Sequence, residues 1–211
     1  MPGLFVTFEG GEACGKSTQV SRLARRLEAK GCPIVLTREP GSTRAGEMIR
    51  HLLLHTESGV NLTNKTELLL FAASRAQMVE EIVLPALKVN KIVLADRFTD
   101  STTVYQGVAR GLGLEFLRHL EDFVCLGLKP NVTFLLDLDL ETMRSRQLRR
   151  VRPVEAKDRM EELPLEFHQK VREGYLALAR EFPERIKLIN AARPEAEVEA
   201  VIWKEINAIL G

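Results

Sequence analysis

Residues 4–18 read LFVTFEGGEACGKST, and this stretch decides the fold. The first six residues are mostly apolar and predict a buried strand, whereas residues 10–18 fit the P-loop pattern G-x-x-x-x-G-K-[ST] that opens a helix. In such a loop, glycines let backbone N–H groups converge on a phosphate, and the helix N-terminus adds partial positive charge. We therefore expect a nucleoside triphosphate here, with Lys16 neutralising its β- and γ-phosphates and the Ser17 hydroxyl ligating Mg²⁺. The residues predicted to bind this nucleotide are Gly10, Gly11, Glu12, Ala13, Cys14, Gly15, Lys16, Ser17 and Thr18.

The rest of the chain alternates short apolar runs with longer helical patterns. The predicted strands are Leu4–Glu9, Ile34–Arg38, Ile92–Asp96, Val132–Asp137 and Ile186–Asn190. Helical patterns cover about residues 16–30, 44–54, 66–88, 99–124 in two parts, 141–150, 163–180 and 194–209. This alternation predicts an α/β fold, a five-stranded parallel sheet with helices on both faces. Ligands of such sheets bind at the carboxyl ends of the strands.

Length and charge narrow the class of protein. A chain of 211 residues is predicted to form one domain, residues 1–211. Its 30 Lys plus Arg and 29 Asp plus Glu leave a net charge of +1, which argues against a protein-wide cationic surface for nucleic acid or anionic lipid. The longest run without charged residues, 101–109, is far shorter than the ~20 residues of a membrane helix, and three scattered cysteines suggest reduced thiols. We expect a cytoplasmic protein that binds neither nucleic acid nor a membrane.

Arginines follow the other predicted strands. Arg38 ends the second strand, Arg97 follows the third, and Arg50 lies on the helix between them. Because a guanidinium fork suits phosphate oxygens, arginines converging beside a P-loop imply a second bound phosphate. The alternative is that Arg38 and Arg97 form structural salt bridges with Glu39 and Asp96.

Two predicted helix faces are suited to a planar ring. Phe71 and Arg75 are four residues apart, so that a ring and a hydrogen-bonding fork project together. Thr102, Tyr105 and Gln106 supply a hydroxyl, a ring and an amide at helical spacing. Phe71 alone is more often a core residue, but a core would not favour Arg75 or Gln106.

Other motifs are weaker. The string Asn64-Lys65-Thr66-Glu67 ends in the wrong carboxylate for the guanine-reading N-K-x-D and precedes a helix. His51 and His55 are spaced like zinc ligands, but Leu52 stands where a metalloprotease helix has its glutamate, so an exposed helix face is the better interpretation.

Taken together, six segments resemble the bacterial thymidylate kinase family. They are FEGGEACGKST (8–18), LTREPGST (36–43), ELLLFAASRAQ (67–77), Asp96-Arg97, DSTTVYQGVARGLG (100–113) and DRMEELPLEFHQKVREGY (158–175). The resemblance implies a P-loop nucleoside monophosphate kinase fold that transfers a phosphoryl group from ATP to dTMP, giving dTDP on the way to dTTP. It also implies Mg²⁺ as cofactor and a homodimer. Another P-loop nucleotide or deoxynucleoside kinase is the alternative; a nucleic-acid-binding P-loop ATPase would need aromatic residues that 144–159 lack.

The resemblance assigns roles to individual positions. Phe71 would stack on the thymine, Arg75 would bond its carbonyl, and Thr102 and Gln106 would read the remaining polar edge. Tyr105 would pack against the deoxyribose, and Glu12 would contact the region of its 3′-hydroxyl. Arg38, Arg50 and Arg97 would hold the dTMP phosphate, with Glu39 and Asp96 organising them and the Mg²⁺ waters. Ser17 and Asp96 are thus the predicted metal residues, and Lys16, Arg97 and a further arginine the predicted catalytic ones.

The further arginine comes from a basic loop predicted over about residues 149–164, which the resemblance identifies as a mobile lid. Family lids often read R-x-R-G-x-x-D-R, whereas here Val154 and Glu155 replace Arg-Gly. Arg149, Arg150 and Arg152 are the candidates, and we favour Arg152. Cys14 departs from the small residues common in the P-loop, and its position at a helix N-terminus beside Lys16 predicts thiol-sensitive activity.

Overall fold

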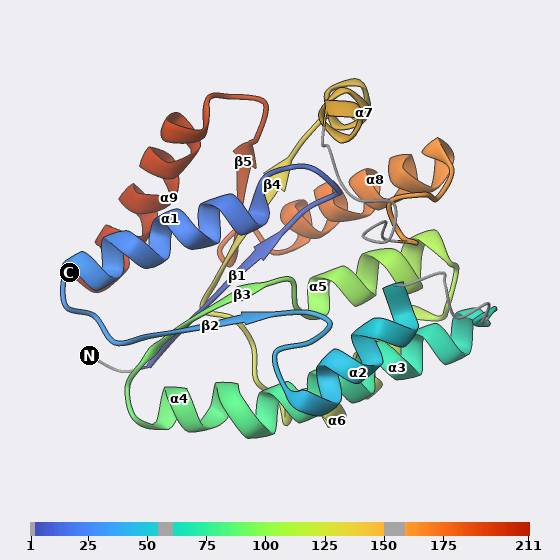
Figure 1. The fold of residues 1–211 in the computed structure, drawn as a ribbon, viewed down its shortest axis with the longest axis horizontal. Coiled ribbons are helices and arrows are strands. Elements are labelled where there is room, and N and C mark those ends of the chain that lie inside the picture. Colours follow the sequence, from blue (N-terminus) through green and yellow to red (C-terminus); the bar gives the residue numbers. More distant parts are fainter. Residues whose placement is uncertain (1–2, 55–60, 150–158) are drawn as a thin grey trace.

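The fold is a central parallel sheet with helices on both faces, as the strand–helix alternation predicts (Figure 1). The computed structural model describes residues 3–54, 61–149 and 159–211. Its strands have the predicted bounds: β1 (Leu4–Glu9), β2 (Ile34–Arg38), β3 (Ile92–Asp96), β4 (Val132–Asp137) and β5 (Ile186–Asn190). They are parallel throughout, in the order β2-β3-β1-β4-β5. The central position of β1 brings the P-loop between the segments that follow β3 and β4.

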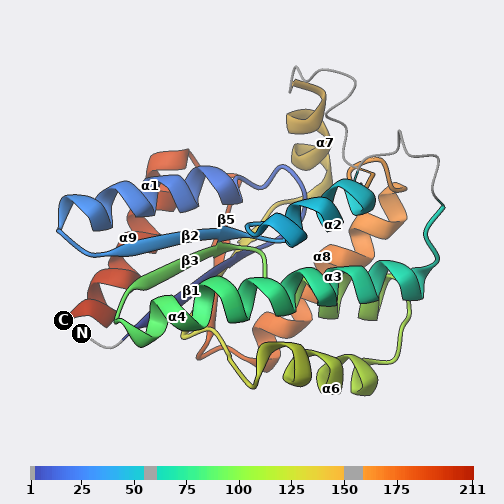
Figure 2. The same cartoon turned by 60° about the horizontal axis from the view of Figure 1, so that its bottom comes forward.

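The helices divide between the two faces of the sheet (Figure 2). Helices α1 (Lys16–Ala29) and α9 (Glu195–Leu210) cover one face, and α4 (Leu84–Lys88) and α8 (Leu165–Glu181) pack on the other. The remaining α-helices are α2 (Arg44–Leu54), α3 (Asn64–Met78), α5 (Thr99–Thr102), α6 (Leu114–Cys125) and α7 (Leu140–Arg149). No helix in the described ranges is long and apolar enough to cross a bilayer.

Two predicted helices contain π-helical segments. The pattern over residues 66–88 is α3, the segment η2 (Val79–Val83) and α4 in direct succession, and α5 continues into the segment η3 (Thr103–Ala109). A π segment shifts the helical phase, and hydrophobic spacing alone does not reveal it. Because η3 carries Tyr105 and Gln106, this departure lies at the predicted site.

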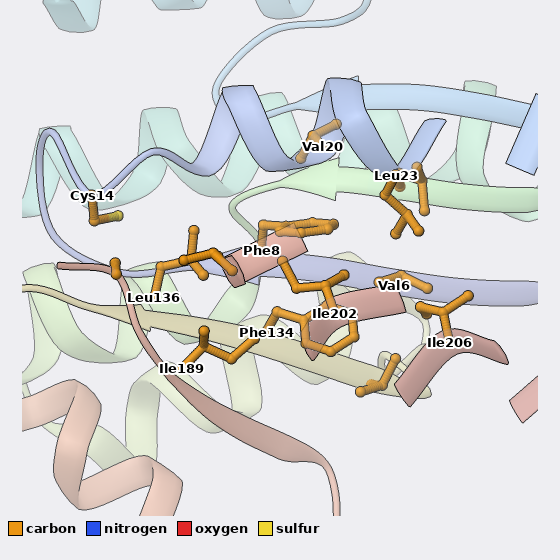
Figure 3. Packing of buried hydrophobic residues seen from close by; sticks show 14 of the residues in the cluster. Val6, Phe8, Cys14, Val20, Leu23, Phe134, Leu136, Ile189, Ile202 and Ile206 are labelled. Carbon is orange, nitrogen blue, oxygen red and sulfur yellow. The ribbon is translucent and has the colours of Figure 1, made fainter. Parts of the chain in front are cut away.

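The core on the α1/α9 face holds the P-loop strand in place (Figure 3). Val6 and Phe8 of β1 and Phe134 and Leu136 of β4 are at most 2% exposed, and they pack against Leu23 of α1 together with residues of α9. Since side chains alternate along a strand, Phe5 points to the opposite core cluster. The strand that leads into the P-loop is therefore fixed by apolar packing on both faces.

Candidate active site

A cavity of about 220 Å³ opens at the carboxyl ends of β1, β2 and β3. It is lined by nearly all residues that the sequence singles out. These are Glu12, Ala13, Cys14, Gly15, Lys16, Ser17, Thr18, Arg38, Glu39, Arg50, Phe71, Arg75, Asp96, Arg97, Thr102, Tyr105 and Gln106. Gly10 and Gly11 lie on the other side of the loop, against a smaller cavity next to α8.

The P-loop wraps around the lysine that begins helix α1. Lys16 Nζ donates hydrogen bonds to the carbonyl oxygens of Gly10 (3.2 Å) and Gly11 (2.7 Å). The backbone φ of Gly10 is 137°, and a Cβ there would come within 2.5 Å of the Leu136 carbonyl oxygen. The loop therefore needs glycine at this position, and its lysine is held at the mouth of the anion-binding turn.

Arg97 links the P-loop to Tyr105 of η3 across the cavity. Its guanidinium donates to Glu12 Oε1 (2.7 Å) and to the carbonyl oxygen of Gly10 (3.1 Å), and the Tyr105 hydroxyl also donates to Glu12 Oε1 (2.8 Å). Burial works to raise the pKa of Glu12, but the charges of Arg97 and Lys16 outweigh it and lower that pKa to about 2. The glutamate is therefore an anion that orients Arg97.

Glu9, the last residue of β1, holds the segment that carries Arg97 in place, and the sequence did not point to it. Its carboxylate accepts hydrogen bonds from the Phe98 N–H (2.7 Å), the Ser101 hydroxyl (2.6 Å) and the Tyr175 hydroxyl (2.8 Å). Burial and the nearby charge of Asp100 raise the pKa of Glu9 to about 6. A carboxylate at the end of an otherwise apolar strand was the available signal.

Arg75 is buried, which corrects the expectation that a core would exclude it. The side chain is 1% exposed and forms ion pairs with Glu39 and Glu121. It also donates to Thr102 Oγ1 (2.9 Å) and the Phe98 carbonyl oxygen (3.2 Å), so its five N–H groups all have acceptors within the protein. Glu39 therefore organises Arg75, and not the predicted phosphate-binding arginines.

The cluster around Arg75 contains one more negative group than positive. Burial raises the pKa of Glu39 to about 7, opposed by Arg75 and assisted by the negative charge of Glu121. The Cys125 thiol donates to Glu121 from the other side at 3.7 Å. A single cation between two buried carboxylates leaves one of them prone to keep its proton near neutral pH.

Arg38 and Arg50 approach the cavity from β2 and α2. Arg38 is paired with Glu47 at 3.1 Å, and Arg50 Nη1 donates to the Pro40 carbonyl oxygen at 2.8 Å. The alternative salt bridges, Arg38 with Glu39 and Arg97 with Asp96, do not form, because Arg38 pairs with Glu47 and Arg97 with Glu12. Both arginines line the cavity, and the Arg38 side chain is 56% exposed.

Ser17 and Asp96 fit a magnesium site. The Ser17 hydroxyl donates to Asp96 Oδ2 at 2.6 Å, beside Lys16 in the cavity wall. Mg²⁺ in nucleotide enzymes takes one or two protein oxygens and completes its shell with phosphate and water. This pair offers that small oxygen set, and no cluster of three or more His, Cys, Asp or Glu with metal-binding geometry occurs among the described residues.

A second groove of about 420 Å³ lies on the other side of the P-loop, and sequence reasoning missed it. It is lined by Ala13, Gly15 and Thr18 together with Arg146 of α7 and Arg193 after β5. Arg146 donates to the carbonyl oxygens of Ala13 (3.4 Å) and Ala191 (2.8 Å). The P-loop therefore borders this groove toward β5 as well as the cavity toward β3.

The predicted lid arginines and the predicted reactive cysteine differ in how far the structure describes them. Arg150 and Arg152 lie outside the described residues, and Arg149 is the exposed last residue of α7. Cys14 is only 3% exposed and belongs to the core cluster of Figure 3. Its thiol donates to the Gly11 carbonyl oxygen at 3.1 Å. This burial does not favour rapid modification of the thiol.

Comparisons with known proteins agree over nearly the whole chain. The family model described as thymidylate kinase matches residues 8–202. The thymidylate kinase of Pelotomaculum thermopropionicum is 44% identical, with 100% of this chain and 95% of the relative covered, and that of Deinococcus radiodurans is 45% identical with 97% of each covered. The solved structure of thymidylate kinase from Ehrlichia chaffeensis superposes with a TM-score of 0.77 at 32% identity, covering 98% of this chain and 99% of that one.

Proposed function

The chain belongs to the thymidylate kinase family, and we propose that the cavity beside its P-loop is where it phosphorylates dTMP. The protein is a dTMP kinase, for which the family implies ATP as donor and a place in dTTP synthesis. One observation carries the assignment of the site. A single cavity is lined both by the P-loop lysine and by Phe71, Thr102 and Gln106.

The reaction needs positioning and charge neutralisation more than covalent chemistry. The dTMP phosphate oxygen is itself the nucleophile, so no general base is required. Arg38, Arg50 and Arg97 hold this phosphate in line with the donor, while Lys16 and Arg97 stabilise the charge of the transferring group. Glu12 keeps Arg97 oriented through the 2.7 Å ion pair. Arg152, proposed from the sequence alone, would add a further cation.

Ser17 and Asp96 would hold Mg²⁺ at the donor phosphates. When bound, the ion supplies positive charge to the phosphate oxygens. The hydrogen bond between the two side chains keeps their oxygens together beside the lysine. The donor nucleoside fits the groove formed by Arg146, Ala191 and Arg193, because this hollow adjoins the P-loop opposite the dTMP cavity.

The acceptor base lies against Phe71, with Thr102 and Gln106 at its polar edge. Phe71 is only partly buried and lines the cavity, as a stacking platform must. Arg75 acts on this edge through Thr102, to which it donates a hydrogen bond, and direct contact with the base would require sharing one of its donors. Tyr105 lies between the base edge and Glu12, where the deoxyribose would pass.

We further propose a homodimer in the cytoplasm. Phe116 and Phe123 are 58% and 78% exposed and lie seven residues apart on α6, on one face of the helix. Exposed apolar side chains gathered on one helix face mark an interaction surface. Sedimentation of Phe123→Asp against the unaltered protein tests this: a monomeric variant supports the dimer, and an unchanged mass contradicts it.

The experiment for the function is an acceptor panel with ADP formation as readout. With ATP and Mg²⁺ present, dTMP should give the highest kcat/KM among dTMP, dUMP, dCMP, dGMP and thymidine. Phe71→Ala should raise the KM for dTMP much more than the KM for ATP, because the ring contacts only the acceptor. An equal effect on both substrates would contradict the location of the base.

A further inference from the structure

Gln106, at the predicted base edge, is tied to a buried carboxylate on another helix. Gln106 Nε2 donates to Glu67 Oε1 of α3 at 3.0 Å. Glu67 is 1% exposed and also accepts from Arg110 (3.1 Å) and Arg159 (2.6 Å). The Gln106 amide is therefore held by a charged cluster of Glu67, Arg110 and Arg159, none of which has been given a role in binding or catalysis.

The ionisation state of Glu67 decides which way the amide faces. Burial works to raise the pKa of Glu67, but the hydrogen bond from Gln106 and the charge of Arg110 outweigh it, so the pKa lies below its ordinary value. An ionised carboxylate only accepts hydrogen bonds, so Gln106 must offer it the NH₂ end. The carbonyl oxygen Oε1 then faces away from Glu67. No described residue donates a hydrogen bond to Oε1, and Gln106 lines the cavity.

We propose that Glu67 is a positioning residue that keeps the Gln106 carbonyl oxygen toward the bound base, and so selects pyrimidines with an N–H at ring position 3 over cytosine. This inference rests on the proposed position of the base. Thymine and uracil carry a hydrogen at N3 and can donate it to Oε1. Cytosine presents a lone pair at N3, which would face the lone pairs of Oε1 and leave both acceptors unsatisfied.

Thr102 cannot make this selection alone. A hydroxyl both donates and accepts, and its hydrogen rotates to suit either base. The hydrogen bond from Arg75 Nη1 occupies one acceptor position of Thr102 Oγ1, but the hydroxyl keeps its own donor. The fixed amide is therefore the group whose polarity distinguishes the two bases.

The test is Glu67→Gln, with kcat/KM measured for dTMP, dUMP and dCMP. A glutamine at position 67 can donate to the Gln106 carbonyl and allow the amide to turn over. The dTMP/dCMP preference should fall by about tenfold or more, whereas the dTMP/dUMP preference should stay constant because both bases carry the N3 hydrogen. An equal loss for all three substrates would mean that Glu67 is only structural and would overturn the proposal.

Two further variants separate the possible failures. Gln106→Leu should reduce the dTMP/dCMP preference by itself, and Glu67→Gln added to it should cause no further change. If Gln106→Leu leaves the preference unchanged, the base does not lie against this amide, and the proposed position of the base fails. If Gln106→Leu changes the preference but Glu67→Gln does not, only the role of Glu67 fails.

Variants of Arg110 control for the charge of the Glu67 cluster. Arg110→Lys perturbs the cluster but keeps the carboxylate that Gln106 requires, so the dTMP/dCMP preference should stay as in the unaltered enzyme. If Glu67→Gln does not fold, Glu67→Gln/Arg110→Gln removes one charge of each sign and should show the same fall in preference. An undiminished preference in that double variant contradicts the proposal equally.

Discussion

Replacing Glu39 by glutamine should change how stability depends on pH in a direction opposite to that of a simple salt bridge. Glu39 is 6% exposed, and burial together with the charge of Glu121 raises its pKa from 4.5 to about 7, although Arg75 is its partner. The native state then binds a proton that the unfolded chain releases. Stability from this proton is complete below about pH 4.5 and is lost as the pH rises through about 7.

The size of this effect follows from the pKa difference. At about 1.4 kcal/mol per pH unit, the rise from 4.5 to about 7 corresponds to about 3 kcal/mol of unfolding free energy. Glutamine resembles the protonated glutamate in shape and charge. Glu39→Gln should therefore lie within about 1 kcal/mol of the unaltered protein near pH 5 and exceed its stability by up to about 3 kcal/mol near pH 8.

Urea unfolding followed by circular dichroism between about pH 5 and pH 8 measures this difference. Asp122→Asn is a matched control, because it removes a carboxylate from the exposed face of α6, the helix that carries Glu121. Its curve should run parallel to that of the unaltered protein. If Glu39→Gln is less stable by the same amount at every pH, Glu39 is ionised throughout and the reasoning about the cluster is refuted.

Three other perturbations address the P-loop and the metal residues. Lys16→Met should lower kcat by at least about 10²-fold in steady-state assays while the KM for dTMP changes little, since the lysine stabilises the transferring group; a selective rise in the dTMP KM would contradict this role. Asp96→Asn should raise the Mg²⁺ concentration for half-maximal activity several-fold, and an unchanged metal dependence would remove Asp96 from the metal site. Gly10→Ala should lower the free energy of unfolding by at least about 2 kcal/mol in urea titrations, because φ is 137° and Cβ would meet the Leu136 carbonyl oxygen at 2.5 Å; an unchanged midpoint would show that the loop adapts.

Much of the site could be predicted because parallel strands end together. Lys16 follows β1, Arg38 ends β2 and Arg97 follows β3, so strand order alone brings them to one edge. The strands were predictable to the residue since each is a short apolar run bounded by charged or turn residues. All but three of the predicted site residues line one cavity; Gly10 and Gly11 lie behind it, and Arg152 lies outside the described residues.

The pairing of buried charges could not be predicted. Glu121 shares a face of α6 with the buried apolar residues Leu117, Val124 and Cys125, so helical spacing predicts its burial. It does not predict its partner, because Arg75 lies 46 residues away on another helix. Glu67 belonged to a string rejected as a guanine-reading motif, and its contact with Gln106 depends on how α3 packs beside η3. The π-helical segments were also missed, because each is short and adds only about one residue to a long helix, which leaves the average apolar spacing almost unchanged.

The Gly10 carbonyl oxygen accepts hydrogen bonds from both Lys16 (3.2 Å) and Arg97 (3.1 Å). The cation assigned to the donor and the one assigned to the acceptor thus share a single main-chain atom. No exchange of side chains at position 10 can remove that atom, so sequence divergence leaves the link between the two half-sites intact as long as the turn itself survives. Only a chemical change of the backbone, such as an ester in place of the Gly10–Gly11 amide, would weaken this acceptor without altering any side chain. Lys16 and Arg97 would then be held less firmly in position relative to each other.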